Sequence, residues 1–380
     1  NGTLTVSGGF AIPDASAVTL ANAAGAALVL SNSEAIGSLT GGGTTGGNVR
    51  LNANTLTVGG DGTSPAAFGG VIGGSGGVTK IGAGTLTLSG TNTYSGLTTI
   101  DGGIVRVSSS SNLGDGGAAN DLAFGGGTLQ ASGTFATGRD VQLNSGGGTF
   151  LVDNGITMTV TGIVSGAGDF TKTGLGTVVF GNAGNDYTGR TLIHGGTLSI
   201  SNSSHLGALP GSAVADSIVL ANGGTLRSTA TQTLQEQRGI TLGEGGGVLD
   251  ASSGGFYING NIAGGTGLKK TGGADLILQP TSGSNVIGAL EIASARLFFN
   301  GQNSIGLGDI TVRNGATLDY QGNAAALTLE NLVILDSGAR VAARNSTAGL
   351  TLREDTVLPT AGSLVFNSDD QRTTNVTVLA

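Results

Sequence analysis

Few side chains in this sequence are of the types that perform acid–base, nucleophilic or metal chemistry. The 380 residues contain two histidines, no cysteine, and 24 aspartates and glutamates. His194 and His205 lie close together in the sequence, but a zinc site needs further nitrogen or sulfur ligands. We therefore expect both histidines to be surface residues at corners of the chain, and we expect no metal site.

The carboxylates could cleave a polysaccharide if several of them met in one groove. Asp169, Asp186 and Asp216 lie in one part of the chain, but each is beside turn-forming residues, where Asp is common because its side chain bonds the backbone. A polysaccharide-active enzyme is therefore the less favoured alternative. The segment Asp336-Ser337-Gly338 has the order of a serine-protease motif without its preceding glycine, and we expect a turn there. We expect no catalytic residue and no cofactor.

The lysines show a different kind of regularity. The chain has four, at positions 80, 172, 269 and 270, and all lie in one motif: TKIGAGTLTLSG (79–90), TKTGLGTVVFGN (171–182) and KKTGGADLILQP (269–280). None directly follows Gly, which excludes a phosphate-binding P-loop. A glycine follows each aligned lysine by two residues, and an apolar residue follows by six; these positions are Lys80, Lys172 and Lys270, Gly82, Gly174 and Gly272, and Leu86, Val178 and Leu276. We expect a corner at which the lysine faces outward and the glycine adopts a positive φ.

The motif belongs to a long tandem repeat. Segment 102–114, GGIVRVSSSSNLG, matches 195–207, GGTLSISNSSHLG, and 124–132, FGGGTLQAS, matches 221–229, ANGGTLRST. Self-similarity at a fixed period is the signature of a repeat architecture. We divide the chain into one array of about four units, with 1–71 as a partial copy followed by 72–163, 164–261 and 262–380.

Composition limits the class of protein further. Glycine accounts for 74 residues, only 11% of residues are charged, and mean hydropathy is positive at +0.20, which is unlike a disordered chain. The net charge of −8 argues against nucleic acid as a partner. No apolar run is long enough to span a membrane as a helix, so we expect no direct insertion.

Within each unit, short segments such as GTLTL alternate apolar and polar residues and are bounded by Gly, Asn, Ser and Asp. That pattern is typical of strands and turns. Tandem strands bury their apolar side chains by stacking as a solenoid. The sequence therefore predicts an all-β, parallel β-helix in a single elongated rod, with about 20–24 residues per coil from the strand and turn spacing. The residues predicted to face inward are Leu86, Leu88, Val178, Phe180, Leu276 and Leu278, while Thr85 and Thr87 should face outward.

The residues 76–114, GGVTKIGAGTLTLSGTNTYSGLTTIDGGIVRVSSSSNLG, and 168–207 resemble the passenger-associated repeat of bacterial autotransporters, as in Antigen-43-like and AidA-like adhesins. The third copy departs from the pattern, because SGSNVIGALEIASA (282–295) replaces the segment that contains Tyr. The resemblance implies a right-handed β-helix on the surface of a Gram-negative bacterium, carried by a C-terminal β-barrel translocator. Neither that barrel nor a signal peptide is present in this chain, which suggests a fragment or a processed passenger.

The resemblance implies no particular activity beyond attachment. It implies a non-catalytic adhesin that binds either other copies of itself or ligands on host or abiotic surfaces. A structural filament or a surface-layer component is the alternative, because open coil edges and sides can also associate. The sequence alone leaves these two functions open.

Overall fold

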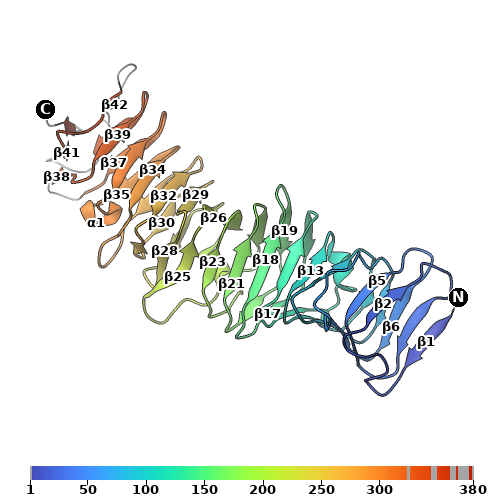
Figure 1. The fold of residues 1–380 in the computed structure, drawn as a ribbon. Helices are drawn as coiled ribbons and strands as arrows, with labels where there is room; N and C mark the ends of the chain where they lie inside the picture. The colour runs from blue at the N-terminus through green and yellow to red at the C-terminus, as the bar shows by residue number, and fades with distance from the viewer. Residues whose placement is uncertain (1, 323–325, 344–348, 360–364, 367–375, 379–380) are drawn as a thin grey trace. The chain divides into compact units, whose positions relative to one another are not determined.

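The computed structural model of the chain describes residues 2–322, 326–343, 349–359, 365–366 and 376–378 (Figure 1). The chain divides into two compact units, one of residues up to Gly189 together with Ser204–Ala208, and one of Arg190–Ser203 with Leu209 onward. Helix is restricted, in the described part, to three single turns: η1 (Ser110–Leu113), η2 (Ser203–Leu206) and α1 (Gln302–Ile305). The prediction of an all-β fold is confirmed.

Unit 1 is a parallel β-solenoid whose strands form several sheets along the stacked coils. The first sheet contains β1 (Thr3–Val6), β3 (Ala27–Leu30), β6 (Asn48–Asn52), β8 (Ile72–Gly74) and β11 (Thr93–Tyr94). The second contains β4 (Glu34–Ile36), β7 (Leu56–Val58), β9 (Val78–Lys80), β12 (Thr98–Ile100), β14 (Leu122–Phe124), β17 (Val141–Leu143) and β20 (Val164–Gly166). The third contains β10 (Thr85–Leu88), β13 (Ile104–Val107), β15 (Thr128–Ala131), β18 (Gly148–Val152) and β21 (Phe170–Thr173). Two smaller groups are β2 (Ala17–Leu20) with β5 (Ser38–Gly41), and β16 (Phe135–Thr137) with β19 (Thr157–Val160) and β22 (Thr177–Phe180).

Unit 2 is built in the same way. One run of strands is β23 (Thr191–Ile193), β25 (Val214–Leu220), β28 (Arg238–Leu242) and β31 (Ile262–Ala263). A second is β24 (Thr197–Ile200), β26 (Gly224–Ser228), β29 (Gly247–Ala251), β32 (Gly267–Thr271), β34 (Ala289–Ile292), β36 (Asp309–Val312) and β39 (Val333–Leu335). A third is β27 (Gln232–Leu234), β30 (Phe256–Ile258), β33 (Leu276–Leu278), β35 (Arg296–Phe299), β37 (Thr317–Tyr320), β40 (Arg340–Ala343) and β42 (Val365–Phe366). The last is β38 (Leu327–Thr328), β41 (Leu350–Leu352) and β43 (Val376–Val378).

The strand register gives the length of a coil directly. Leu86 pairs with Val105, Val105 with Leu129, and Leu129 with Phe150, which are 19, 24 and 21 positions apart in the sequence. The described strands make up about 16 parallel coils. The prediction of a parallel β-solenoid with roughly this coil length is therefore confirmed.

The core lies inside the coils, where side chains of successive coils stack in rows. All six residues predicted to face inward are buried, each at most 2% exposed: Leu86, Leu88, Val178, Phe180, Leu276 and Leu278. In unit 1 the rings of Phe124, Phe150 and Phe170 follow one another at centroid distances of 5.3 Å. Burying each such ring contributes roughly 1.5–3 kcal/mol. Thr85 and Thr87 lie on the opposite face of their strand and are half-buried by their neighbours.

The high glycine content has a steric cause at the corners. A Cβ on Gly84 would lie 1.8 Å from the carbonyl oxygen of Thr63 in the preceding coil, and one on Gly76 would lie equally close to that of Asn54. Only glycine permits the backbones of adjacent coils to approach this closely. Glycine is therefore required by the stacking itself at these corners.

Candidate functional site

The repeat lysines are inside the coils, so the prediction that they face outward is wrong. Lys80 is 1% exposed, and Lys172 and Lys270 are fully buried. The prediction for the glycines is confirmed, because Gly82, Gly174 and Gly272 have φ values of 66°, 73° and 86°. The chain turns at the glycine, and the turn directs backbone carbonyl groups towards the interior.

Each buried ammonium group bonds these carbonyl groups. Lys270 Nζ donates to the carbonyl oxygens of Thr271, Gly272 and Ala274 at 2.9, 2.9 and 2.7 Å. An ammonium group has three donors and no acceptor, so these three bonds use its whole donor capacity. Burial lowers the pKa of Lys270 to about 8, and it lowers that of Lys172 to about 8 as well. The buried lysine therefore has a structural role, because its ammonium group bonds the carbonyl groups that the turn leaves inside the coil.

The lysines of consecutive repeats do not stack on one another. Lys80 lies in β9 of the second sheet of unit 1, paired with Ile100, whereas Lys172 lies in β21 of the third sheet, paired with Phe150. Four coils after Lys80, the row that contains it has reached Gly166, so Lys172 lies six positions further along the chain. The repeat motif therefore moves to another sheet from one copy to the next.

A buried asparagine that bonds the backbone of neighbouring coils was not predicted from the sequence. Asn92 Oδ1 accepts from the backbone N–H of Ile72 at 2.8 Å, and its Nδ2 donates to the carbonyl of Asn112 at 2.5 Å, so one side chain connects three successive coils. The equivalent asparagines make the same pair of bonds: Asn185 with Val164 and His205, and Asn285 with Ile262 and Ser304. The signal was present, because an Asn precedes the Tyr position in each copy and is retained in the third, where Tyr is absent.

The two histidines have different environments. His194 is exposed, as predicted. His205 lies in η2 and is only 4% exposed, so the prediction of a surface position is wrong for this residue. It occupies the place that Asn112 has in η1, which is also buried. Burial lowers the pKa of His205, which favours the neutral ring.

The three aspartates weighed as parts of a polysaccharide site have separate environments. Asp186 is exposed, Asp169 is half-buried, and Asp216 forms an ion pair with Arg190 at 3.2 Å. Asp336-Ser337-Gly338 forms a turn, with Gly338 at a φ of 80°, as predicted. Within the described residues there is no group of three or more His, Asp or Glu side chains placed to hold a metal ion.

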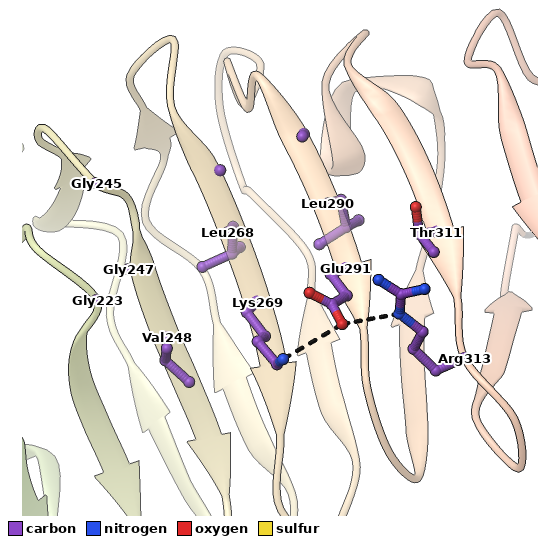
Figure 2. A pocket seen from close by; sticks show the side chains of 12 residues that line it. Gly223, Gly245, Gly247, Val248, Leu268, Lys269, Leu290, Glu291, Thr311 and Arg313 are labelled. Carbon is purple, nitrogen blue, oxygen red and sulfur yellow. Dashed lines mark hydrogen bonds and ion pairs between the residues drawn. The ribbon is translucent and has the colours of Figure 1, made fainter.

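A groove of about 390 Å³ lies on the outer face of unit 2 (Figure 2). It extends across β29, β32, β34 and β36, and its polar side is the outward row in which Lys269, Glu291 and Thr311 stand in register. Beside that row, Gly267 and Ala289 pair in the adjacent outward row. Because these two residues have little or no side chain, the sheet surface is hollow there.

Charged side chains on three coils form a network along the groove. Glu291 Oε1 accepts from Lys269 Nζ at 3.3 Å and from Arg313 Nε at 2.9 Å, and both side chains point towards it in Figure 2. Arg313 also approaches Asp336, with Nη1 3.6 Å from Oδ2. The hydrogen bond from Arg313, together with that from Lys269, lowers the pKa of Glu291. A carboxylate held ionised in this way is a poor general acid.

Comparison with known families agrees with the fold and the repeat. The model of the passenger-associated transport repeat matches residues 78–107 and 170–200. These two segments contain Lys80 and Lys172 and the strands that follow them. The chain is therefore an autotransporter passenger segment built on this repeat, a class found at the surface or outside Gram-negative bacteria.

Among individual proteins, the chain is similar to the adhesin BmaC autotransporter of Brucella suis biovar 1 (strain 1330). The two are 33% identical over 299 residues, which is 74% of this chain and 8% of the relative. The chain thus spans a small fraction of the length of that protein. No solved structure matches the chain. None of the described helices is long and apolar enough to cross a membrane.

Proposed function

We propose that this segment is a non-catalytic, adhesive part of an autotransporter passenger that mediates attachment between cells or between a cell and a surface. The observation that carries the proposal is the set of uncharged polar rows on the outside of the coils. Thr57, Thr79 and Thr99 stand in register on three successive coils of unit 1, half-exposed. Such a row offers hydroxyl groups spaced one strand apart, about 4.8 Å.

The placement of these rows suits many weak contacts. Each hydrogen bond to a partner surface has a small net free energy, on the order of 1 kcal/mol. Contacts repeated along the coils and among many displayed copies add through multivalency. The similarity to a protein named as an adhesin supports the same function.

The proposal also covers how the segment is displayed, what it binds and how it is divided into repeat units. The segment would be displayed at the outer membrane by a C-terminal β-barrel translocator of the same precursor. Its ligands would be other passengers or host and abiotic surfaces, and autoaggregation and biofilm formation would follow from the first of these. We also propose the division into repeat units 1–71, 72–163, 164–261 and 262–380.

Surface display tests the proposal. A non-adherent Gram-negative strain that displays residues 1–380 on a translocator should attach to itself or to a surface more than a strain with the translocator alone. A variant with Thr57→Asp, Thr79→Asp and Thr99→Asp should attach less. The introduced carboxylates repel those on another copy, and they are strongly hydrated, so bringing them against a partner surface is unfavourable. Ordered end-to-end assembly without attachment would instead indicate a structural filament. Release of reducing ends from a panel of polysaccharides would contradict the absence of catalysis.

A further inference from the structure

We propose that the groove on unit 2 binds a neutral glycan, with Glu291 accepting a hydrogen bond from one sugar hydroxyl and Lys269 and Arg313 donating to its neighbour. This inference rests on the adhesive function proposed above and names the ligand class of one site within it. The unused hydrogen-bonding groups, the charge balance and the shape of the groove support it.

The unused groups are of two complementary kinds. Glu291 Oε1 accepts both bonds from the cations, so among the described residues its Oε2 makes no hydrogen bond or ion pair. The Glu291 side chain is 31% exposed and lines the groove. Lys269 Nζ uses one of its three N–H donors on Glu291. Arg313 uses Nε on Glu291, and its Nη1 lies at the ion-pair distance of 3.6 Å from Asp336, which leaves N–H donors on Nη1 and Nη2. One acceptor therefore lies beside several donors, all on charged groups.

A pair of adjacent sugar hydroxyls matches this arrangement. Each hydroxyl is both a donor and an acceptor, so one can donate to a carboxylate while the next accepts from a cation. Hydrogen bonds to ionised partners are shorter and roughly twice as strong as those between neutral groups. The mutual bonds among Lys269, Glu291 and Arg313 hold these groups in place before a ligand arrives, which reduces the entropy lost on binding.

The charge balance favours a neutral ligand over an acidic one. Two cations, Lys269 and Arg313, stand with two carboxylates, Glu291 and Asp336, so the network has no excess positive charge. A carboxylate or sulfate bound to the unused donors of Lys269 or Arg313 would lie near the carboxylate of Glu291, and like charges brought together at an interface are unfavourable.

The shape of the groove agrees with a short saccharide. Its volume of about 390 Å³ lies within the range of roughly 300–1,000 Å³ for small-molecule sites. Gly267 and Ala289 leave room for a ring next to the charged row, and the half-buried Val248 provides an apolar contact at one end. The residues lining the groove include no aromatic ring, so affinity for one saccharide will be low and attachment will depend on many copies.

Two variants of the whole chain test the site by different routes. Glu291→Gln removes the ionised acceptor, and Ala289→Leu fills the hollow without touching a charge. Ala289 is exposed on β34, so the leucine variant is expected to fold. Arg106→Gln is the matched control, because Arg106 is also on an outer strand face beside an acid, Asp153, at 3.8 Å, but in unit 1.

Binding is measured with immobilised chain and neutral hexasaccharides of glucose or mannose, with a heparin-derived hexasaccharide as the acidic probe. We expect the unaltered chain to bind a neutral probe, both groove variants to bind it roughly ten-fold or more weakly, and the control to be unchanged. Glu291→Gln should also improve heparin binding, since it leaves the two cations less compensated. Preference of the unaltered chain for heparin, absence of binding to every probe, or binding unaffected by both groove variants would overturn the inference.

Failure of this site and failure of adhesion give different results. If displaying cells attach while the chain binds no neutral saccharide, the groove assignment is wrong and the adhesive function stands. If the groove binds a saccharide as described while displaying cells attach to nothing, the site stands and the adhesive function is wrong.

Discussion

At the scale of single residues, the repeat lysine shows how a charged side chain is accommodated in an apolar core. Lys270 replaces the hydration of its ammonium group with three carbonyl groups that the corner must bury anyway. A buried polar group without a partner costs more than an ordinary hydrogen bond returns. The lysine and the turn therefore depend on each other, which accounts for its recurrence at the same place in each repeat.

Replacing Lys270 with methionine should destabilise the fold, because a side chain of similar length leaves the carbonyls of Thr271, Gly272 and Ala274 without their donor. We expect a loss of about 2–5 kcal/mol in the free energy of unfolding at pH 7. The neighbouring Lys269→Met is the control, since Lys269 is on the surface and exposed pairs contribute about 0–1 kcal/mol. Denaturant unfolding measures both. Equal losses in the free energy of unfolding for the two substitutions would show that the hydrogen bonds from Lys270 to the carbonyl groups do not stabilise the fold.

The same lysine predicts a dependence on pH. Its pKa is about 8 in the folded chain and near the ordinary 10.5 in the unfolded chain, so between these values the unfolded state binds more protons. Stability therefore rises with pH over this window. We expect the free energy of unfolding of the unaltered chain to increase from pH 8 to pH 10.5 relative to Lys270→Met. A difference between the two proteins that stays constant over this range would contradict the lowered pKa.

At the scale of strands and corners, coils are held in register by side chains that bond two neighbouring coils at once. Asn92 is the clearest example, because it bonds the backbone of a coil on each side. The sequence has no cysteine, and the described coils contain only single-turn helices. Buried polar side chains that bond neighbouring coils therefore add to the apolar rows in fixing the spacing of the coils. Asparagine suits the position since it carries one acceptor and one amide donor group.

Asn92→Leu should cost about 2–4 kcal/mol of stability, since it leaves the N–H of Ile72 and the carbonyl of Asn112 buried without partners. The adjacent Thr93 is exposed, and Thr93→Val should change stability by less than about 0.5 kcal/mol. Chemical denaturation of the two variants compares them. If Asn92→Leu proves as mild as the control, water or a backbone shift must satisfy these groups.

Strand placement was predictable from the sequence because apolar and polar residues alternate so regularly. Leu86 and Leu88 alternate with Thr85 and Thr87, and the structure has this pattern. The outward prediction for the lysines departs from this alternation. Val78 is inward and Thr79 is outward, so period two alone would have placed Lys80 inward. The groove could not be predicted, since it depends on which outward residues of different coils come into register.

An inward position of this alternation is a direct check on the fold. Val178 is fully buried in β22, and Val178→Asp would place an ionisable carboxyl there without a partner. We expect the variant to lose at least about 4 kcal/mol of stability or to fail to fold, whereas Thr177→Asp on the outer face should fold normally. Circular dichroism and limited proteolysis distinguish the two. A Val178→Asp variant as stable as the unaltered chain would contradict the inward assignment.

At the scale of the whole molecule, the sparse charge is the property most relevant to attachment. The chain carries a net charge of −8, but only 11% of its residues are charged. Repulsion between copies acts through exposed charges and is screened beyond about 8 Å at physiological salt. Hydrogen bonds from outward threonines, serines and asparagines depend little on salt. Attachment between copies should therefore strengthen as the ionic strength rises towards physiological values.

Settling of beads that carry residues 1–380 tests the adhesive account most directly. Beads are followed from low to physiological salt, alone and with cultured cells or a glass surface, and beads carrying His194→Ala serve as a control for the exposed histidine. We predict that clumping or attachment increases with salt and is unchanged by His194→Ala, because uncharged outward rows make the contacts. Beads that neither clump nor attach to any surface at any salt concentration would contradict the account.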